Sequence, residues 1–450
     1  MRILLINPPR FNGHSIIREM RCVGVTIVSV FPPIELAYLA GLLRNHAEVK
    51  ILDANALNQD FKYIEKEISN FKPEAVVFTA SLPSFTADIQ VAKIAKMVDS
   101  SIKTILLESH VLTVMPEKVK QTFPEIDYLV GTEPLMTIPK LLGFPGTDNL
   151  EEHPLPAYDL LPIKKYSSIS FAKRKPFASL VTSVGCPHRC SFCPIGGATV
   201  ERGYGKKWRF KSPQKILEEM RHLLTLGVKS LYFFDETFTV DKERVENLCQ
   251  LIINKGLKID WACNGRVDTL DEGMIKIMKK AGCWNIMFGI ECGSQQLLED
   301  VQKGTTLVKA INIVDLCKKN GISVTASFII GSPEETWETV EQTLELAKKI
   351  NVHRAQFDML TPFPGTRFYE EVKKRGLLEK EYSFSGYDAY CIDEPPVIRT
   401  EKMSSGELSQ AYRYLYRKFY LRPSLWIKTL LGIRSFNQFV DIIKFIRYLK

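Results

Sequence analysis

The sequence of 450 residues lacks several features that would place it in a specialised class of protein. No apolar run reaches about 18 residues without a charged residue, so we expect no membrane-spanning helix. The N-terminal segment carries one basic residue, a short apolar stretch and two prolines, which predicts a first strand and its turn instead of a secretory signal. Low-complexity segments are also lacking. At roughly 150 residues per domain, the length predicts two or three domains.

The ten cysteines lack the spacing of a disulfide framework. Such frameworks belong to small secreted domains, so we expect reduced thiols and a cytoplasmic protein. For the seven cysteines without ligand spacing, a buried apolar thiol is the default interpretation. These seven are Cys22, Cys249, Cys263, Cys283, Cys292, Cys317 and Cys391.

Most of the chain also lacks an excess of charge, although the formal net charge is +9. Residues 411–450 hold nine Lys and Arg against one acidic residue, while the rest of the chain holds 51 basic and 50 acidic residues. A nucleic-acid-binding protein more often spreads positive charge across a folded face, so we expect no nucleic-acid partner.

Short apolar strands alternate with amphipathic helical segments in the first third of the chain. This alternation predicts a parallel sheet covered on both faces, in a doubly wound, Rossmann-like α/β domain over residues 1–145. The segment 146–172, rich in proline and polar residues, is predicted to be a linker. The expected elements are strands at 2–6, 48–52, 74–79 and 103–107 and a helix at 34–43.

The alternation resumes over residues 173–375 with six strand–helix units. Six is fewer than the eight of a closed barrel, so we expect an open, partial (β/α)6 barrel with its chemistry at the carboxyl ends of the strands. A helical region over 376–450 follows. The expected strands are 178–182, 231–234, 257–262, 284–290, 322–330 and 355–361.

Three cysteines, Cys186, Cys190 and Cys193, lie within one loop directly after the first of these strands. Thiolates are the ligands of iron–sulfur clusters, and three of them can hold three irons of a four-iron cluster while the fourth iron stays open. The alternative is a zinc site. A closed zinc site needs a fourth protein ligand, and the nearest other donor, His188, lies between two ligands of a tight loop.

This Cx3Cx2C spacing, with the aromatic Phe192 before the third cysteine, resembles the radical S-adenosylmethionine (radical SAM) superfamily. The resemblance implies that Cys186, Cys190 and Cys193 hold a 4Fe-4S cluster whose open iron binds S-adenosylmethionine (AdoMet). It also implies reductive cleavage of AdoMet to a 5′-deoxyadenosyl radical, with electrons from a donor such as flavodoxin or ferredoxin. The sequence has no second cysteine triad, which argues against a methylthiotransferase or a multi-cluster maturase.

Five later segments also resemble superfamily motifs. Residues 235–237 take the place of the motif that binds the AdoMet ammonium, although Asp235 can also cap a helix. Arg266 resembles the arginine that meets the AdoMet carboxylate, with Asp268 to orient it. The segments 289–294, 327–336 and 361–366 resemble the remaining motifs. The implied AdoMet-binding residues are Phe192, Asp235, Glu236, Arg266, Glu291, Ile329 and Gly331.

The order of a doubly wound domain, a linker and the cysteine loop resembles the cobalamin-binding-domain branch of radical SAM enzymes. That branch includes the Mg-protoporphyrin ester cyclase and hopanoid C-methylases. The resemblance implies a cobalamin-dependent C-methyltransferase that acts on an unactivated carbon. The implied cobalamin contacts are Asp53, Ser81, Ser84 and His110.

Two departures from the branch leave alternatives open. Asp53 is not followed by the histidine and glycine of a DxHxxG motif, and Leu107 and Glu108 stand where the branch usually has glycines. Glycines let a backbone approach a ligand closely. One alternative is therefore a degenerate cobalamin domain, in a radical cyclase or C–C coupling enzyme that acts on a lipid or tetrapyrrole. A non-catalytic binding or electron-transfer protein is a third hypothesis.

The basic segment 411–450 also contains ten aromatic residues. Basic and aromatic amphipathic helices favour a membrane interface, so peripheral membrane contact and an apolar or lipid substrate are one interpretation. A helix that packs on the barrel with a solvated basic face is the other.

Overall fold

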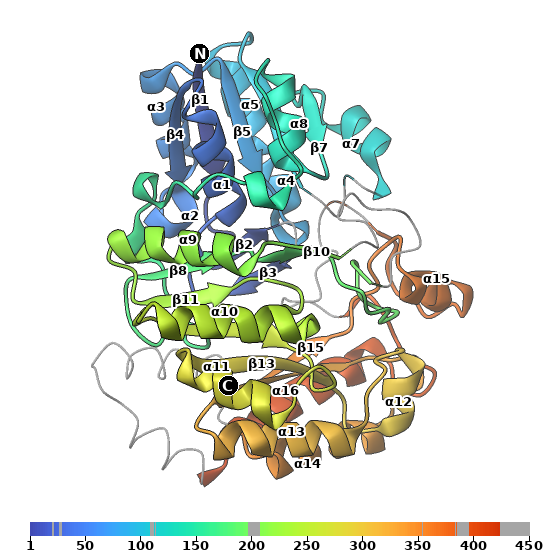
Figure 1. Cartoon of the computed structure of the whole chain (residues 1–450). Coiled ribbons are helices and arrows are strands. Elements are labelled where there is room, and N and C mark those ends of the chain that lie inside the picture. Colours follow the sequence, from blue (N-terminus) through green and yellow to red (C-terminus); the bar gives the residue numbers. More distant parts are fainter. Residues whose placement is uncertain are drawn as a thin grey trace.

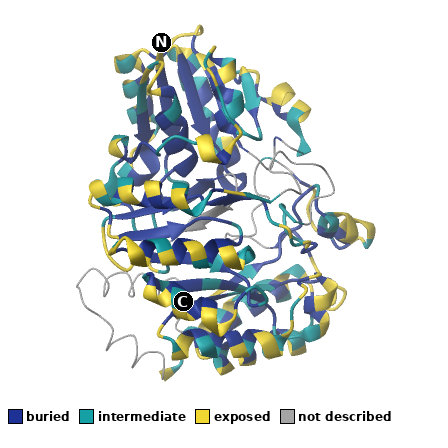
Figure 2. Ribbon diagram, in the orientation of Figure 1, coloured by how far each residue is buried: buried dark blue, intermediate teal, exposed yellow. Residues whose placement is uncertain are grey.

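A computed structural model describes residues 1–19, 22–26, 29–108, 112, 114–196, 208–352, 354–382, 384 and 396–423, without the side chains of 22–26. The described residues form two large parallel sheets, of five and six strands. The N-terminal sheet lies above the second one in Figure 1. In Figure 2 the strands of both sheets are buried, and the outer faces of the helices are exposed.

The N-terminal sheet has the strand order β4-β1-β5-β6-β7, all parallel. The chain adds β4 on one side of β1 and the later strands on the other side, so the strand order reverses between β1 and β5. Ligands of such sheets bind at the carboxyl ends of the strands at this switch point. The expected doubly wound domain is confirmed. Its strands are β1 (Arg2–Asn7), β4 (Glu48–Asp53), β5 (Ala75–Thr79), β6 (Lys103–Leu107) and β7 (Tyr128–Val130), and its helices are α1 (Ile34–Leu43), α2 (Ala54–Leu57), α3 (Phe61–Phe71), α4 (Phe85–Asp88), α5 (Gln90–Val98), α7 (Pro116–Thr122) and α8 (Pro134–Leu141).

A hairpin that the sequence pattern did not predict follows β1. Its antiparallel strands are β2 (Ser15–Glu19) and β3 (Cys22–Thr26). Glu19 accepts hydrogen bonds from the backbone amides of Ile34 and Glu35, at 2.9 and 3.2 Å. A carboxylate is stabilised at the positive end of a helix, so Glu19 fixes the hairpin against the start of α1.

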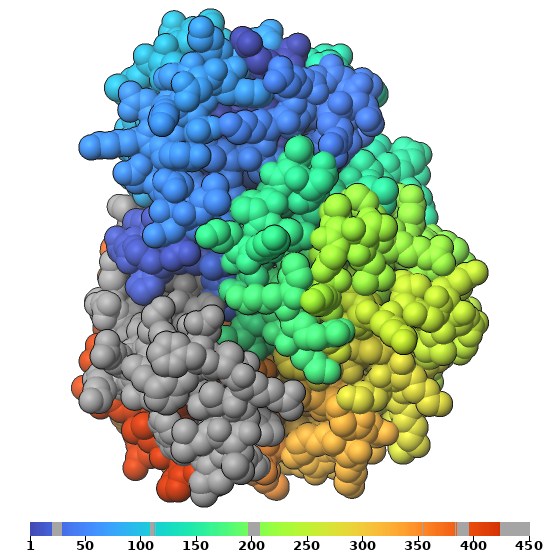
Figure 3. Space-filling model, turned by 90° about the vertical axis from the view of Figure 1, so that its left-hand side faces the viewer, coloured from blue at the N-terminus to red at the C-terminus, as the bar shows by residue number. Residues whose placement is uncertain are grey.

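The segment 146–172 connects the two sheets and packs closely on both. Tyr158 donates a hydrogen bond to the Ser179 carbonyl of the second sheet, at 2.6 Å, and the amide of Ala157 bonds to the Ala37 carbonyl of α1 at 2.9 Å. A Cβ on Gly41 would lie 2.3 Å from the Leu155 carbonyl oxygen, so only glycine permits this approach. Figure 3 shows this segment, in green, across the junction of the two sheets.

The second sheet is the expected open barrel, with six parallel strands in the order β15-β14-β13-β12-β11-β8. Its strand β12 begins at Asp260, three residues later than predicted, because Gly256 takes a left-handed turn with φ +61°. The strands are β8 (Phe177–Leu180), β11 (Ser230–Phe233), β12 (Asp260–Gly265), β13 (Cys283–Glu291), β14 (Ser323–Ile330) and β15 (Arg354–Met359), and the helices are α9 (Pro213–Thr225), α10 (Lys242–Asn254), α11 (Glu272–Lys280), α12 (Gln295–Asp300), α13 (Leu307–Lys319), α14 (Trp337–Lys349) and α15 (Arg367–Lys374).

Helix α16 (Ser405–Tyr420) covers the free edge of β15. The Tyr416 hydroxyl accepts a hydrogen bond from the Phe357 amide at 3.2 Å, and the Tyr420 hydroxyl bonds to both backbone groups of Ala355. These contacts satisfy backbone groups that an edge strand otherwise exposes. Residues 424–450 lie outside the described residues, and so does most of the tail that was predicted to contact a membrane. A search of the described helices found none with both the length and the apolarity to cross a bilayer.

Candidate functional site

The three-cysteine loop lies at the carboxyl end of the first barrel strand, between β9 (Ser183–Val184) and β10 (Arg209–Phe210). Gly185, with φ +83°, turns the chain into the loop. A Cβ on Gly196 would lie 2.2 Å from the His188 carbonyl oxygen, so this glycine lets the loop close on itself. The loop thus holds its three thiols within one tight turn of chain.

The three thiols suit an iron–sulfur cluster as a donor set. Burial raises the pKa of Cys193 to about 11 and also raises that of Cys186, and the charge of Cys190 adds to both shifts. A bound metal supplies the positive charge that offsets such shifts. Within the described residues, no three Cys, His, Asp or Glu side chains converge as ligands of a single metal ion do. A cubane cluster does not require this, because each cysteine binds a different iron.

Arg266 points at the cysteine loop from the end of β12. Asp268 holds its guanidinium with two hydrogen bonds, of 2.9 and 3.0 Å, while Nη1 lies 3.6 Å from the Cys190 sulfur. This two-point contact fixes the plane of the guanidinium, as a carboxylate-binding arginine requires. In the structure, Asp268 therefore orients Arg266, as the sequence predicted.

Lys303 is a member of this site that the sequence motifs did not indicate. Its ammonium lies 2.5 Å from the Glu291 carboxylate, and its carbonyl accepts a hydrogen bond from Arg266. Both side chains of the ion pair are over 90% buried. The structure thus joins Cys190, Arg266, Lys303 and Glu291 in one chain of contacts at the carboxyl ends of the strands.

Asp235 is engaged within the protein. Its carboxylate accepts hydrogen bonds from the Thr182 amide and hydroxyl and from the Ser183 hydroxyl, and Arg244 lies 3.8 Å away. These donors contact the same carboxylate oxygens that were predicted to accept hydrogen bonds from the AdoMet ammonium. Glu236, the next residue, is half-buried, and its charge contributes to the raised pKa of Cys186, so it lies closer to the cysteine loop.

A small pocket lies at the carboxyl ends of β13 and β14. Ile329 and Glu291, both predicted AdoMet contacts, line it. Gly331, with φ +105°, donates its amide at 3.2 Å to the carboxylate of Glu335, which also lines the pocket. Phe192 is half-buried against the core. The pocket lining is Glu291, Cys292, Leu297, Val301, Ile329, Ser332, Glu335 and Leu360.

Glu335 gives this pocket a testable pH dependence. Burial raises its pKa from 4.5 to about 7, so the folded protein binds its proton more tightly than the unfolded chain does. The stabilisation from protonated Glu335 is complete below pH 4.5 and is lost as the pH rises through 7. Urea unfolding measures the difference in unfolding free energy between Glu335→Gln and wild type at each pH. We expect this difference to shift by about 3 kcal/mol in favour of Glu335→Gln as the pH rises from 4.5 to 8.

The matched control is Glu345→Gln, on the exposed side of α14. This surface change is expected to shift the unfolding free energy by no more than about 0.5 kcal/mol at either pH. A difference between Glu335→Gln and wild type that does not vary with pH would contradict the assignment.

The second candidate site lies at the switch point of the N-terminal sheet. Asp53, at the end of β4, is buried and accepts hydrogen bonds from Asn7 at 2.9 Å and from the Tyr166 hydroxyl at 2.8 Å. Asn55, which replaces the histidine of DxHxxG, is fully buried and bonds to Ser15 and Ile16 of the hairpin. Asn58, which replaces the glycine, has φ +54°, so asparagine here adopts the left-handed conformation that glycine favours.

A buried ion pair completes this edge of the sheet. Arg18 of the hairpin binds Asp88 at 2.8 and 2.9 Å and also bonds to Asn7 at 3.3 Å. The Ser84 hydroxyl and the Ser81 amide donate to the same Asp88 carboxylate, at 2.7 and 3.2 Å. The predicted contacts Asp53, Ser81 and Ser84 are thus brought together through Arg18 and Asn7, which sequence reasoning did not single out.

Two hydroxyls at this edge suit a ligand. The Thr79 and Ser81 hydroxyls, at the end of β5, are buried and make no hydrogen bond within the described residues. Buried polar groups nearly always find a partner, so these oxygens fit a polar ligand such as the tail of a cobalamin. Glu108 is buried and accepts a hydrogen bond from the Leu112 amide at 3.1 Å. His110 lies outside the described residues.

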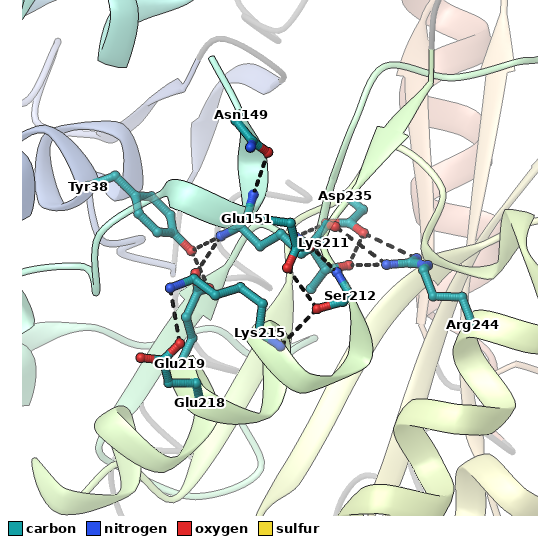
Figure 4. A network of polar contacts seen from close by, with 11 residues as sticks. Tyr38, Asn149, Glu151, Lys211, Ser212, Lys215, Glu218, Glu219, Asp235 and Arg244 are labelled. Carbon is teal, nitrogen blue, oxygen red and sulfur yellow. Dashed lines mark hydrogen bonds and ion pairs between the residues drawn. The ribbon is translucent and has the colours of Figure 1, made fainter. Parts of the chain in front are cut away.

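A buried polar network ties the two sheets together. Tyr38 of α1 donates to Glu219 of α9 at 2.7 Å, and Lys211 contacts both, at 2.9 and 2.6 Å. The Lys211 amide bonds to the Thr182 carbonyl at 2.8 Å. Thr182 in turn binds Asp235. Figure 4 shows this network from Tyr38 through Lys211 and Glu219 to Asp235 and Arg244.

Comparisons with known proteins match both halves of the chain to families. Residues 180–347 match the radical SAM superfamily, and residues 20–138 match the B12-binding domain. An uncharacterized methyltransferase of Pyrococcus horikoshii is 36% identical over 97% of this chain and 96% of its own length. The anaerobic magnesium-protoporphyrin IX monomethyl ester cyclase of Rubrivivax gelatinosus is 26% identical over 94% of this chain and 78% of its own length.

The fold is also shared with a solved structure. OxsB, a cobalamin-dependent AdoMet radical enzyme with aqua-cobalamin and AdoMet bound, aligns with a TM-score of 0.73 over 99% of this chain and 70% of its own. At 16% identity this likeness establishes the fold alone. The two matched families, radical SAM and B12-binding, agree with the expected AdoMet and cobalamin. The chain therefore belongs to the cobalamin-dependent radical SAM enzymes, and the relatives that it matches in this family include methyltransferases.

Proposed function

We propose that this enzyme transfers a methyl group to an unactivated carbon of a small molecule, with a 4Fe-4S cluster, AdoMet and cobalamin as cofactors. The observation that carries the proposal is the placement of the two sites. In Figure 1, β1 runs from the N-terminus toward the barrel, so the carboxyl edge of its sheet faces the barrel. The Tyr166–Asp53 hydrogen bond joins that edge to the linker. A ligand of the N-terminal sheet therefore lies against the barrel.

When bound, the cluster and AdoMet supply a carbon-centred radical, and cobalamin supplies the methyl group. The protein binds and orients these groups. Cys186, Cys190 and Cys193 hold the cluster. Arg266, fixed by Asp268, is oriented to bind a carboxylate next to Cys190.

The remaining predicted contacts have complementary roles in this proposal. Glu291, which is paired with Lys303, and Ile329 line the AdoMet pocket and exclude water from it. At the other sheet, Asp53, Thr79, Ser81 and Ser84 bind the cobalamin. The division into a cobalamin domain (1–145), a linker (146–172), a barrel (173–375) and a C-terminal region (376–450) belongs to the same proposal, as does an external electron donor such as ferredoxin or flavodoxin.

The second candidate is a radical cyclase. It is favoured by the similarity to the magnesium-protoporphyrin ester cyclase of Rubrivivax gelatinosus, which extends over 94% of this chain. Such an enzyme cleaves AdoMet without methyl transfer.

The test is cofactor analysis of the protein after anaerobic reconstitution with iron, sulfide and cobalamin. We expect about one four-iron cluster and one corrinoid per chain after gel filtration, and 5′-deoxyadenosine on addition of a strong reductant and AdoMet. The variant Ser81→Val, which removes a buried hydroxyl but keeps the cluster loop, is expected to lose corrinoid and keep iron. If the wild-type protein lost its corrinoid on gel filtration as completely as Ser81→Val does, that result would contradict a cobalamin-binding domain.

A further inference from the structure

One face of the barrel sheet is unusually polar across β13, β14 and β15. Phe357 stacks on Phe328 with ring centroids 5.4 Å apart and meets Tyr416 of α16 edge-on at 5.3 Å, so these residues face the outer helix layer. Side chains alternate along a strand, and the intervening residues therefore point into the open barrel. By the strand register, this inner face carries Asn285, Met287, Thr325, Ser327, Ile329, Gln356 and Asp358.

Asp358 is the carboxylate of this inner face on β15. Its Oδ1 accepts a hydrogen bond from Gln356 Nε2 at 3.1 Å, and its Oδ2 lies 3.4 Å from the Ser327 hydroxyl. Both partners are neutral. Within the described residues, no Lys, Arg or His side chain forms an ion pair with Asp358 or contributes to its pKa shift.

In the part of the chain that the structure describes, no neighbouring cation therefore balances the charge of Asp358. Burial raises its pKa to about 6, with a further contribution from the Glu291 carboxylate, so it is mostly ionised at neutral pH. Glu291 is itself paired with Lys303. Asp358 is partly buried, and a partly buried carboxylate without a cation is costly, so a cationic ligand lowers that cost.

Asp358 also lies where a substrate would meet the radical site. It pairs across the sheet with Ile329, which lines the pocket at the carboxyl ends of β13 and β14. Neighbouring strands lie about 4.8 Å apart, so Asp358 is one strand away from that pocket. Gln356, on the same face, is solvent-exposed, so the face is accessible.

We propose that Asp358, with Ser327 and Gln356, binds a protonated nitrogen of the substrate, as in an amine or an amidine. This inference rests on the proposed function and specifies its substrate class. A carboxylate only accepts hydrogen bonds, and it pairs with a cation that donates them. Met287 and Ile329, on the same face, provide apolar contacts beside the charged one. The substrate is therefore a nitrogen base, in contrast to a wholly apolar lipid.

The test uses three probes of one shape and different charge: phenethylamine, 2-phenylethanol and 3-phenylpropionate. Their binding to the full-length protein without cofactors is measured by ligand-observed NMR titration. We expect the amine to bind most tightly and the carboxylate most weakly. Asp358→Asn is expected to weaken the amine at least tenfold and to leave the alcohol unchanged.

A second variant does not alter the carboxylate. Gln356→Lys, at an exposed position, places a cation beside Asp358 and is expected to displace the amine to the same extent. The control Asp315→Asn removes an exposed carboxylate on α13 and should change nothing. The proposal is overturned if the amine does not bind, if amine and alcohol bind equally, or if both variants bind the amine as wild type does. Amine binding by a protein that never cleaves AdoMet would overturn the proposed function and leave this site in place.

Discussion

Replacing Cys190 with alanine is expected to abolish iron incorporation and AdoMet cleavage while the protein remains folded. Each cysteine of the triad binds a different iron, so two thiolates cannot hold the cluster as three do. Cys190 is also the thiol that lies 3.6 Å from the Arg266 guanidinium. The loss of the Cys190 thiol therefore affects both the cluster and Arg266, the residue that orients AdoMet. The measurements are iron and sulfide per chain and the rate of 5′-deoxyadenosine formation, which should fall to background.

The matched control is Cys249→Ala, at a fully buried thiol of α10. Burial raises the pKa of that thiol above the range of a reactive cysteine, so it should not take part in metal binding. We expect this variant to incorporate iron as wild type does. Iron loss in Cys249→Ala, or full iron content in Cys190→Ala, would contradict the assignment of the triad.

Glu219→Gln is expected to destabilise the protein by about 3–5 kcal/mol, because it leaves the Lys211 ammonium buried without its counter-ion. Both side chains of this pair are fully buried, and their nearest atoms lie 2.6 Å apart. Lys211→Met alone should cost a similar amount. The double variant Lys211→Met, Glu219→Leu removes both charges and should be close to wild type in stability. Urea unfolding of the four proteins measures these differences.

The exposed pair Lys348–Glu345 provides the comparison, since Glu345→Gln is expected to cost no more than about 0.5 kcal/mol. Hydrogen exchange gives a second measurement. Because Tyr38 bonds to both members of the buried pair, the loss of Glu219 should increase exchange in α1 of the other sheet. A cost below about 1 kcal/mol for Glu219→Gln would contradict a buried, coupled pair.

The alternation of strands and helices predicted every strand of both large sheets except the edge strand β7, because buried parallel strands leave short apolar runs in the sequence. The hairpin Ser15–Glu19 and Cys22–Thr26 was not predicted. Its strands carry no period that distinguishes them from a loop, and its Arg18 is buried only because Asp88, seventy residues away, pairs with it. The misplacement of β12 has a local cause, the left-handed turn at Gly256.

The candidate site was predictable where it follows a motif and was missed where tertiary contacts create it. The cysteine triad, Arg266 and Glu291 stand in recognisable motifs. Lys303 lies in a turn without a motif, and Lys211 follows a basic, aromatic stretch that is typical of an exposed strand. Both are buried by partners from other elements, which the local sequence does not specify. For Asp235, the motif suggested a ligand contact, and the structure shows hydrogen bonds to Thr182 and Ser183.

The most direct test of a cobalamin-dependent methyltransferase is the analysis of AdoMet products with and without cobalamin. The assay needs no substrate, because the reduced cobalamin that is added would accept the first methyl group from AdoMet and leave S-adenosylhomocysteine. After anaerobic reconstitution and reduction, we predict both 5′-deoxyadenosine and S-adenosylhomocysteine when cobalamin is present, and only 5′-deoxyadenosine when it is omitted. Formation of 5′-deoxyadenosine without S-adenosylhomocysteine in the presence of cobalamin would contradict methyl transfer and favour the radical cyclase.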